Sequence, residues 1–152
     1  MTDFLRQRIV GPIMDLLREG ITPEKLALSI ALGATLGVFP VLGSTTILCA
    51  LAAWALRLNQ PAIQLVNYFA YPIQLALIVP FIQLGSRLLG SRAMALSLSQ
   101  MTDMIRSDAL GAISALGAAT LGAIVLWAMA SPIVAAAIYF TLVPVLRRVR
   151  LA

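Results

Sequence analysis

Gly33-Ala34-Thr35-Leu36-Gly37-Val38-Phe39-Pro40-Val41-Leu42-Gly43-Ser44-Thr45-Thr46 is the stretch that decides how this chain folds. It lies inside a run from Leu26 to Leu56 that holds no Asp, Glu, Lys, Arg or His. Because a charge at the bilayer centre costs about 2.5–3.5 kcal/mol, such a run is typical of a membrane-embedded segment. A straight helix of these 31 residues would measure roughly 46 Å, against a hydrocarbon core of roughly 30 Å. One straight span therefore does not fit.

Pro40 offers a solution to this excess length. Proline removes an N–H group, clashes with the preceding turn and disfavours helical geometry at the residue before it. The sequence therefore predicts two half-helices, from Leu26 to about Val38 and from about Ser44 to Leu56. Each would cover roughly 20 Å, which predicts a re-entrant hairpin rather than two crossings. Lipid cannot satisfy the helix ends at such a break, so protein or a water-filled cavity must cover it.

The composition places the whole chain in one polytopic membrane domain. Hydrophobic residues make up 61% of the 152 residues, charged residues 11%, and the mean hydropathy is +0.96. The net charge of +5 comes from Lys and Arg outside the apolar runs, which favours a topology signal over nucleic-acid binding. Cys49, the single cysteine, can form no internal disulfide, and no signal peptide is evident.

The N-terminal part predicts a surface segment followed by the first hairpin. Residues 1–20 mix apolar and charged residues around Gly11-Pro12, which fits a segment on the membrane surface or a helix packed on the bundle. Thr22-Pro23-Glu24 is a helix start, with an N-cap, a first-turn proline and an acid. The first broken hairpin is therefore predicted over residues 22–57.

The second apolar run carries an unusual polar stripe. It extends from Leu58 to Ser86, and its amides and one tyrosine recur at spacings of four and three, on one helical face: Gln60, Gln64, Asn67, Tyr71 and Gln74. Pro72 and Pro80 interrupt the pattern. We therefore predict a second broken hairpin over residues 59–87, with its break near residues 68–73.

The C-terminal third predicts an interfacial connector over residues 93–108 and a helical hairpin over residues 109–147, divided at Ser131-Pro132. If every apolar run is a hairpin, every Lys and Arg falls on one membrane face, as the positive-inside rule prefers. We therefore expect a compact helical bundle in the bacterial inner (plasma) membrane, with cytoplasmic termini and connectors.

Several stretches resemble the bacterial domain-of-unknown-function family 2062. The likeness covers about Gly20 to Arg148, and the stretches that carry it are 22–27, 31–40, 43–46 and Arg57-Leu58-Asn59-Gln60-Pro61. Many members have Asn-Pro followed by Thr, whereas four residues separate Asn67 from Pro72 here. The resemblance implies a small helical inner-membrane protein and no established activity.

The residue types do not support catalysis, a metal site or a cofactor. The chain has no His, and no acid lies within an apolar run. A Ser–His or metal–His site therefore cannot be assembled, and a proton relay would lack an intramembrane carboxylate. We expect a protein that is not an enzyme.

Binding or transport of an anion fits the residues better. If residues 44–56 start at mid-depth, the N–H groups of Ser44, Thr45 and Thr46 form a positive helix end. The stripe of Gln64, Asn67, Tyr71 and Gln74 would supply neutral donors and acceptors, while Arg57 and Arg87 at the cytoplasmic mouth would attract a phosphate. An anionic lipid or a polyprenyl-phosphate carrier is the predicted substrate.

A structural role for the same residues is an open alternative. Ser and Thr cap helices whatever the function, and intramembrane amides hold helices together by about 0.6 kcal/mol per hydrogen bond. The alternative function is a membrane scaffold or oligomerisation partner for an envelope-building enzyme. Membrane lipids are expected partners, and a homo-oligomer is expected under either reading, because a chain this short has few helices to cover its breaks.

Overall fold

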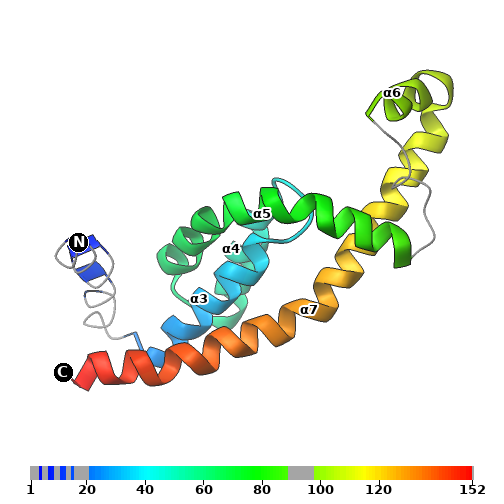
Figure 1. Cartoon of the computed structure of the whole chain (residues 1–152). Coiled ribbons are helices and arrows are strands. Elements are labelled where there is room, and N and C mark those ends of the chain that lie inside the picture. Colours follow the sequence, from blue (N-terminus) through cyan, green and yellow to red (C-terminus); the bar gives the residue numbers. More distant parts are fainter. Residues whose placement is uncertain are drawn as a thin grey trace.

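All regular elements in the described part of the chain are helices. The computed structural model describes residues 21–88 and 98–151, and six isolated positions before them. The helices are α3 (Pro23–Gly37), α4 (Thr45–Leu56), α5 (Gln60–Leu88), α6 (Leu98–Ser107) and α7 (Ala109–Leu151) (Figure 1). The predicted all-α class is confirmed. The surface segment of residues 1–20, apart from those six positions, and the first part of the 93–108 connector lie outside the described residues.

The start of α3 is the one predicted from the sequence. The Thr22 hydroxyl oxygen accepts a hydrogen bond from the Lys25 N–H at 3.2 Å, and Pro23 occupies the first turn. The Thr22 hydroxyl satisfies one of the N–H donors that a helix start leaves unpaired, and Pro23 has no N–H to satisfy. The local sequence therefore fixes this end without help from the rest of the fold.

The chain reverses after α3, as the Pro40 pattern predicted. α3 ends at Gly37, residues 38–44 form a loop, and α4 begins at Thr45. Gly43 has φ +83°, a left-handed conformation that glycine adopts without the steric cost a side chain would bring. The interruption at Pro40 is confirmed, and α3 and α4 form a helical hairpin.

The second predicted break is wrong. α5 is one helix that passes through Pro72 and Pro80. Each proline removes one N–H donor, which bends a helix but does not by itself reverse the chain. No glycine or asparagine lies between Pro72 and Gly85, so the stretch after Pro72 lacks a residue that readily takes the left-handed conformation. Residues 59–87 are therefore a long helix and not a hairpin.

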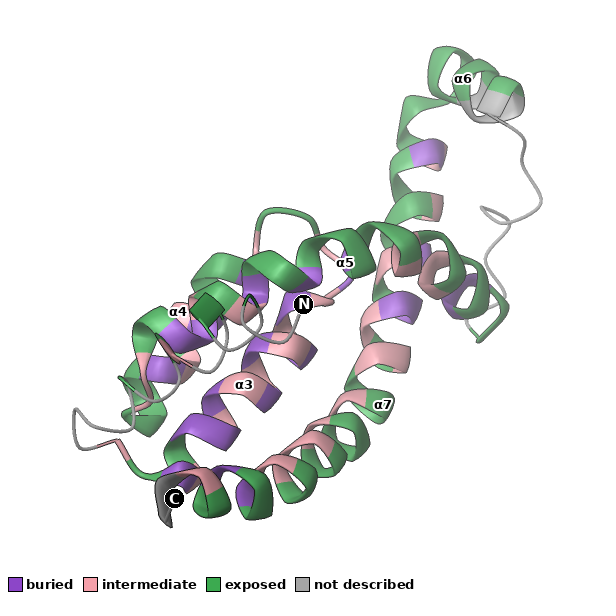
Figure 2. Cartoon of the chain, turned by 60° about the vertical axis from the view of Figure 1, so that its left-hand side comes forward, coloured by how far each residue is buried: buried purple, intermediate pink, exposed green. Residues whose placement is uncertain are grey.

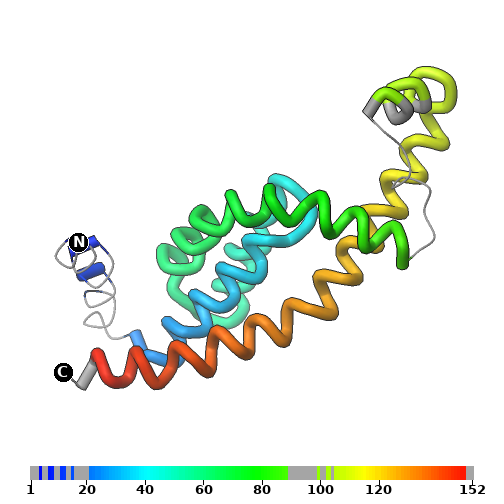
Figure 3. Tube along the Cα trace, viewed as in Figure 1, coloured from blue at the N-terminus to red at the C-terminus, as the bar shows by residue number. Residues whose placement is uncertain are grey.

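The predicted division of the C-terminal run is wrong for the same reason. α7 continues from Ala109 to Leu151 and holds Pro132 and Pro144 in its interior. No glycine follows Gly122 in the sequence. Figure 3 shows α7 as one curved helix in place of the hairpin predicted over residues 109–147. Bends of this kind are what interior prolines cause.

α3 lies at the centre of the packing. α5 and α7 both pack along it, and α4 packs against α5 and α3 (Figure 1). Small residues allow this closeness: a Cβ on Gly33 would lie 2.7 Å from the Ile63 carbonyl oxygen. α5 and α7 meet at Gly85 and Gly122, where a side chain on either would collide with the backbone of the other helix.

The outer surfaces of the two long helices are apolar and uncovered. α5 and α7 are long and apolar enough to cross a membrane, and the most apolar 18-residue windows are only 17% and 11% buried. Figure 2 shows the exposed residues along the outside of both helices. The core helix of a soluble protein would be mostly buried. These helices indicate an association with membrane.

The charged residues separate to two ends of the molecule. Glu24 of α3 accepts a hydrogen bond from Arg147 Nε of α7 at 2.7 Å, and the Lys25 Nζ donates to the Arg57 carbonyl at 3.3 Å. Arg87 lies at the far end of α5, a 29-residue helix whose length is about 43 Å. The expectation that all Lys and Arg share one face is therefore wrong, because it depended on the second hairpin.

Candidate functional site

One side chain from each long helix binds the last turn of α3 or the loop that follows it. Gln74 of α5 is 1% exposed, and its Nε2 donates to the Phe39 carbonyl at 2.7 Å. Trp127 of α7 donates its Nε1–H to the Thr35 carbonyl at 2.9 Å. A helix end leaves such carbonyls without intrahelical partners, so these donors complete the end of α3. The rings of Phe39 and Trp127 also meet edge to face at 4.8 Å.

The contact with Gln74 sets the depth of the loop in the bundle. Gln74 is the central residue of α5, which extends from Gln60 to Leu88. The loop therefore contacts the middle of this long helix, while the outer ends of α3 and α4 lie near the start of α5. The hairpin reaches halfway along the bundle and returns.

The start of α4 has no side-chain cap. The Ser44 hydroxyl donates to the Val41 carbonyl at 2.8 Å, and Ser44 makes no capping hydrogen bond to α4. Thr45 is buried at 7% exposed, whereas Thr46 is exposed. The first-turn N–H groups of α4 therefore retain their capacity to bind an acceptor, with the positive end of the helix behind them.

The predicted polar stripe of α5 serves mainly to bind α4. Gln60 donates to the Ala50 carbonyl at 3.0 Å, and Gln64 donates to the Thr46 carbonyl at 3.0 Å. Asn67, which is 3% exposed, donates its Nδ2 to the Thr46 hydroxyl oxygen at 3.4 Å. It also donates to Gln64 Oε1 at 3.3 Å. These amides donate the hydrogen bonds that hold α4 against α5, which is the structural role considered as an alternative for the stripe.

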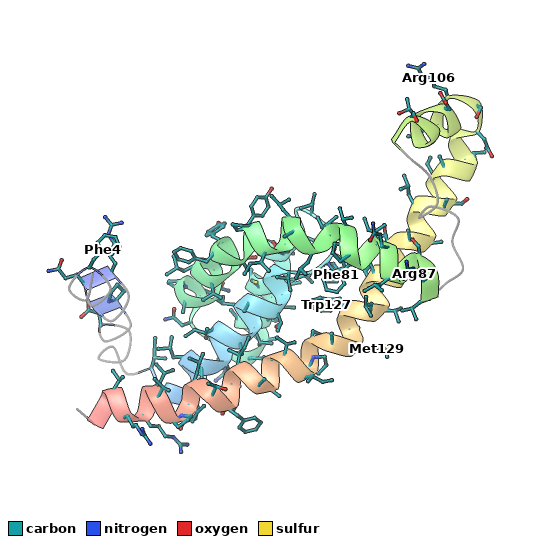
Figure 4. All side chains as sticks on the ribbon, viewed as in Figure 1. Phe4, Phe81, Arg87, Arg106, Trp127 and Met129 are labelled. Carbon is teal, nitrogen blue, oxygen red and sulfur yellow. The ribbon has the colours of Figure 1, made fainter. Side chains whose placement is uncertain are left out.

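The other predicted site residues do not join this cluster. Tyr71 is 50% exposed and lies on the outward side of α5. Arg57 is at the opposite end of α4 from Ser44, and its φ of +52° ends that helix. Arg87 lies at the far end of α5, beside α7 (Figure 4). The two arginines therefore do not lie at one shared entrance to the site, because Arg57 precedes the start of α5 and Arg87 lies in its last turn.

An apolar groove adjoins the loop on the side of α7. Its volume is about 270 Å³, and Val38, Phe81 and Trp127 are among the residues that line it. Figure 4 shows Phe81 and Trp127 pointing into the space between α5 and α7. The groove offers no charged group, and its polar side-chain groups are the hydroxyls of Thr35 and Ser131 and the Trp127 indole N–H, which already donates to the Thr35 carbonyl. It suits a hydrocarbon and not a polar solute.

Sequence reasoning missed Trp127 and Phe39 as parts of the site. Trp127 is 92 residues from Thr35, whose carbonyl it binds. A Trp inside an apolar run is an ordinary membrane residue, so its position gave no signal of this contact. In the described part of the chain, no group of three or more His, Cys, Asp or Glu side chains is placed to hold a metal ion.

The comparisons with known proteins give a family and nothing more. The family described as "Uncharacterized protein conserved in bacteria (DUF2062)" matches residues 7–152. The chain belongs to this family. No curated protein and no solved structure matches the chain. Membership in DUF2062 therefore agrees with the resemblance in residues 22–61 and assigns no chemistry to the site.

Proposed function

We propose that the chain is an integral membrane protein in which α5 and α7 cross the bilayer and α3 and α4 form a re-entrant hairpin. The contact between Phe39 and Gln74 supports this placement, because Gln74 is the central residue of α5. With 15 and 12 residues, α3 and α4 measure roughly 22 Å and 18 Å, too short to cross a hydrocarbon core of roughly 30 Å. The loop then lies near the bilayer midplane.

The charge distribution supports an orientation. Four described basic residues lie at the end that holds the start of α3 and the end of α7: Lys25, Arg57, Arg147 and Arg148. Arg87 and Arg106 lie toward the other end. The positive-inside rule favours the first end in the cytoplasm of a bacterial inner-membrane protein. α6 then lies on the opposite side.

The function that this geometry supports best is binding and movement of an anionic lipid, of the polyprenyl-phosphate kind. The observation that carries the proposal is the uncapped start of α4, which lies beside Gln64 and Asn67, between the start of α5 and its central residue Gln74. Hydrocarbon cannot satisfy N–H groups there, whereas a phosphate can. The sequence holds no Asp or Glu between Glu24 and Asp103, so no carboxylate opposes an anion in this region. The adjoining apolar groove suits the lipid chain.

Substitutions at Ser44 test the proposal. Ser44→Asp would place a carboxylate on the first-turn N–H groups, which stabilises a helix by about 1 kcal/mol. The same carboxylate would repel a phosphate and occupy its donors. We therefore expect reconstituted liposomes with this variant to lose transfer of a fluorescent polyprenyl phosphate at least tenfold, compared at equal amounts of folded protein by circular dichroism.

Matched variants complete this test. Ser44→Ala removes a hydroxyl that does not cap α4, so transfer should stay within about twofold of wild type. Ser44→Asn adds a neutral cap and should give an intermediate loss. Equal transfer by wild type, Ser44→Asp and empty liposomes would overturn the carrier proposal.

A scaffold for an envelope-building enzyme is the second candidate. The internal hydrogen bonds of the amide stripe support it, because Gln64 and Asn67 already bind the chain itself. The exposed start of α7, where Leu110 is 81% exposed, offers a surface for a partner helix. A photo-crosslinker at Leu110 should then capture one envelope glycosyltransferase in cells. Loss of transfer with Ser44→Asp, without such capture, would exclude the scaffold.

A further inference from the structure

One outward surface of the molecule combines large apolar side chains with polar groups. We call it the α4–α5 face and define it by six residues: Ile47, Leu51, Trp54, Tyr68, Tyr71 and Leu75. Their exposed fractions range from 47% to 78%. The spacings i, i+4, i+7 in α4 and i, i+3, i+7 in α5 place each set of three on one side of its helix. The two sides adjoin because α4 packs on α5 through the amide stripe.

The polar groups of this face lie at the depth of the loop. Tyr71 lies three residues before Gln74, and Tyr68 lies about one turn before Tyr71 in α5. Both rings are at least half exposed. Thr46 is exposed beside them, and nothing lies within 4 Å of a Cβ built on Gly43 at the loop tip. Figure 2 shows the tip of the loop in the exposed colour.

Lipid is a poor neighbour for these groups. Backbone N–H groups and phenol hydroxyls need hydrogen-bond partners, and hydrocarbon offers none. The outward residues of the second half of α7 contrast with them, because exposed Ile133, Val134 and Phe140 are wholly apolar and can face acyl chains. The α4–α5 face is therefore the surface that requires protein, given the membrane placement proposed above.

We propose that the α4–α5 face binds the same face of a second copy of the chain, around a twofold axis beside the loop. The face is self-complementary, since it presents donors (the α4 first turn and the two phenols) and acceptors (the phenol oxygens and the loop carbonyls). A twofold pair satisfies both sets at once. The positive ends of two α4 helices then border one sheltered chamber, so each copy completes the anion site of the other.

The size of the face fits a stable dimer. Aromatic side chains bury about 150–250 Å² each, so Trp54, Tyr68 and Tyr71 alone, at 50–78% exposed, supply roughly 300–500 Å² per copy. A standard interface buries about 800 Å² per partner. The three aliphatic side chains and the loop supply the remainder. The surface therefore has enough area without a contribution from α6 or α7.

Cysteine cross-linking in native membranes tests this interface. In a Cys49→Ala background, Ile47→Cys and Tyr71→Cys lie on the face, whereas Phe69→Cys and Ile133→Cys are controls, each 73% exposed in the native chain. Phe69 is on another side of α5, because successive helix residues are about 100° apart. Oxidation should give disulfide-linked dimers from the face positions and not from the controls. Equal linking of all four, or none from the face, overturns the proposal.

A milder variant gives a second measurement that does not depend on cross-linking. Tyr71→Phe keeps the ring and removes one hydroxyl per copy. Because each dimer then loses two membrane hydrogen bonds, its dissociation in detergent should become about tenfold easier. Phe69→Leu should leave dissociation unchanged. Failure of Tyr71→Phe to weaken the dimer would overturn the hydrogen-bonding role of the face.

These measurements separate the dimer from the carrier function. The proposal rests on the membrane placement and needs no substrate for its readout. Cross-linked dimers in a protein that moves no polyprenyl phosphate would overturn the carrier function alone. Transfer by a protein that sediments as a monomer in nanodiscs, with no face cross-links, would overturn the dimer alone.

Discussion

Pro40 and Pro72 lie in similar apolar surroundings, each after an aromatic residue, and the chain responds to them in opposite ways. At Pro40 the helix ends and the chain reverses, whereas at Pro72 α5 continues. Gly43, with φ +83°, lies three residues after the first proline, and no glycine follows the second before Gly85. A proline removes a hydrogen bond, but a reversal also needs a left-handed residue and partners for the freed groups.

The two prolines also differ in whether neighbouring helices supply hydrogen-bond donors for the backbone carbonyls near the break. The carbonyls of Thr35 and Phe39 receive donors from Trp127 and Gln74. Those donors come from the two long helices, so the hairpin depends on the parts of the chain that are not broken. Five sets of substitutions test this dependence, and the most destabilising comes first.

Gln74→Leu should give the largest effect. It leaves the Phe39 carbonyl beside an apolar side chain, and an unsatisfied buried acceptor costs about 1–3 kcal/mol. We expect the SDS concentration at the midpoint of unfolding in mixed micelles to fall accordingly. Gln83→Leu, an exposed position on the same helix, should leave the midpoint unchanged. Equal midpoints for both variants would show that the hydrogen bond from Gln74 does not stabilise the loop.

Trp127→Phe keeps an aromatic ring against Phe39 and removes only the donor to Thr35. We expect a loss of about 1 kcal/mol, the usual net value of one hydrogen bond. Circular dichroism during the same SDS titration measures it. Trp54→Phe is the matched control, since Trp54 is 78% exposed in the monomer. Because Trp54 belongs to the α4–α5 face, this pair is compared at protein concentrations where the chain is monomeric.

Gly43→Ala and Gly117→Ala form a pair with expected effects of opposite sign. A Cβ at either position meets nothing within 4 Å, so backbone conformation alone decides the outcome. At Gly43 the positive φ should cost about 1 kcal/mol. At Gly117, inside α7, alanine should raise the free energy of unfolding by at most about 1 kcal/mol. If both substitutions lowered the stability, the positive φ of Gly43 would not explain why the chain reverses there.

Pro72→Ala should have a small effect in the favourable direction. It restores one N–H donor to α5 without removing a contact that holds the hairpin. A proline in an ideal helix costs about 3 kcal/mol, but α5 has adapted to its prolines, so we expect a gain of at most about 1 kcal/mol. Pro40→Ala, at a buried loop position, should instead lower the SDS midpoint. A change of the SDS midpoint in the same direction for Pro72→Ala and Pro40→Ala would show that the two prolines do not differ in their structural role.

Glu24→Gln should give the smallest effect. It removes the charge that faces Arg147, with 38% and 61% of the two side chains exposed. Exposed ion pairs contribute about 0–1 kcal/mol, and salt screens them. We expect a change below about 0.5 kcal/mol in the midpoint, and less at high ionic strength. A larger change would mean that the ends of α3 and α7, and not the loop contacts, hold the hairpin.

Local sequence determined the all-helical, apolar class, the helix start at Thr22-Pro23, the reversal at residues 38–44 and the position of the amide stripe on one side of its helix. These features depend on groups within a few residues of one another, so hydropathy, capping and backbone sterics suffice to predict them. It did not determine whether Pro72 and Pro132 break their helices, because a lone proline permits either outcome.

The tertiary structure decided what each polar group binds. Gln74 and Trp127 donate to carbonyls of the loop and of the last turn of α3, which are 35 and 92 positions away in the sequence, and no local pattern encodes a contact at that separation. The continuity of α5 likewise sent Arg57 and Arg87 to opposite ends of the molecule. Those placements follow from the packing of α5 and α7 on α3, where close contacts at Gly33 and between Gly85 and Gly122 set which side chains meet.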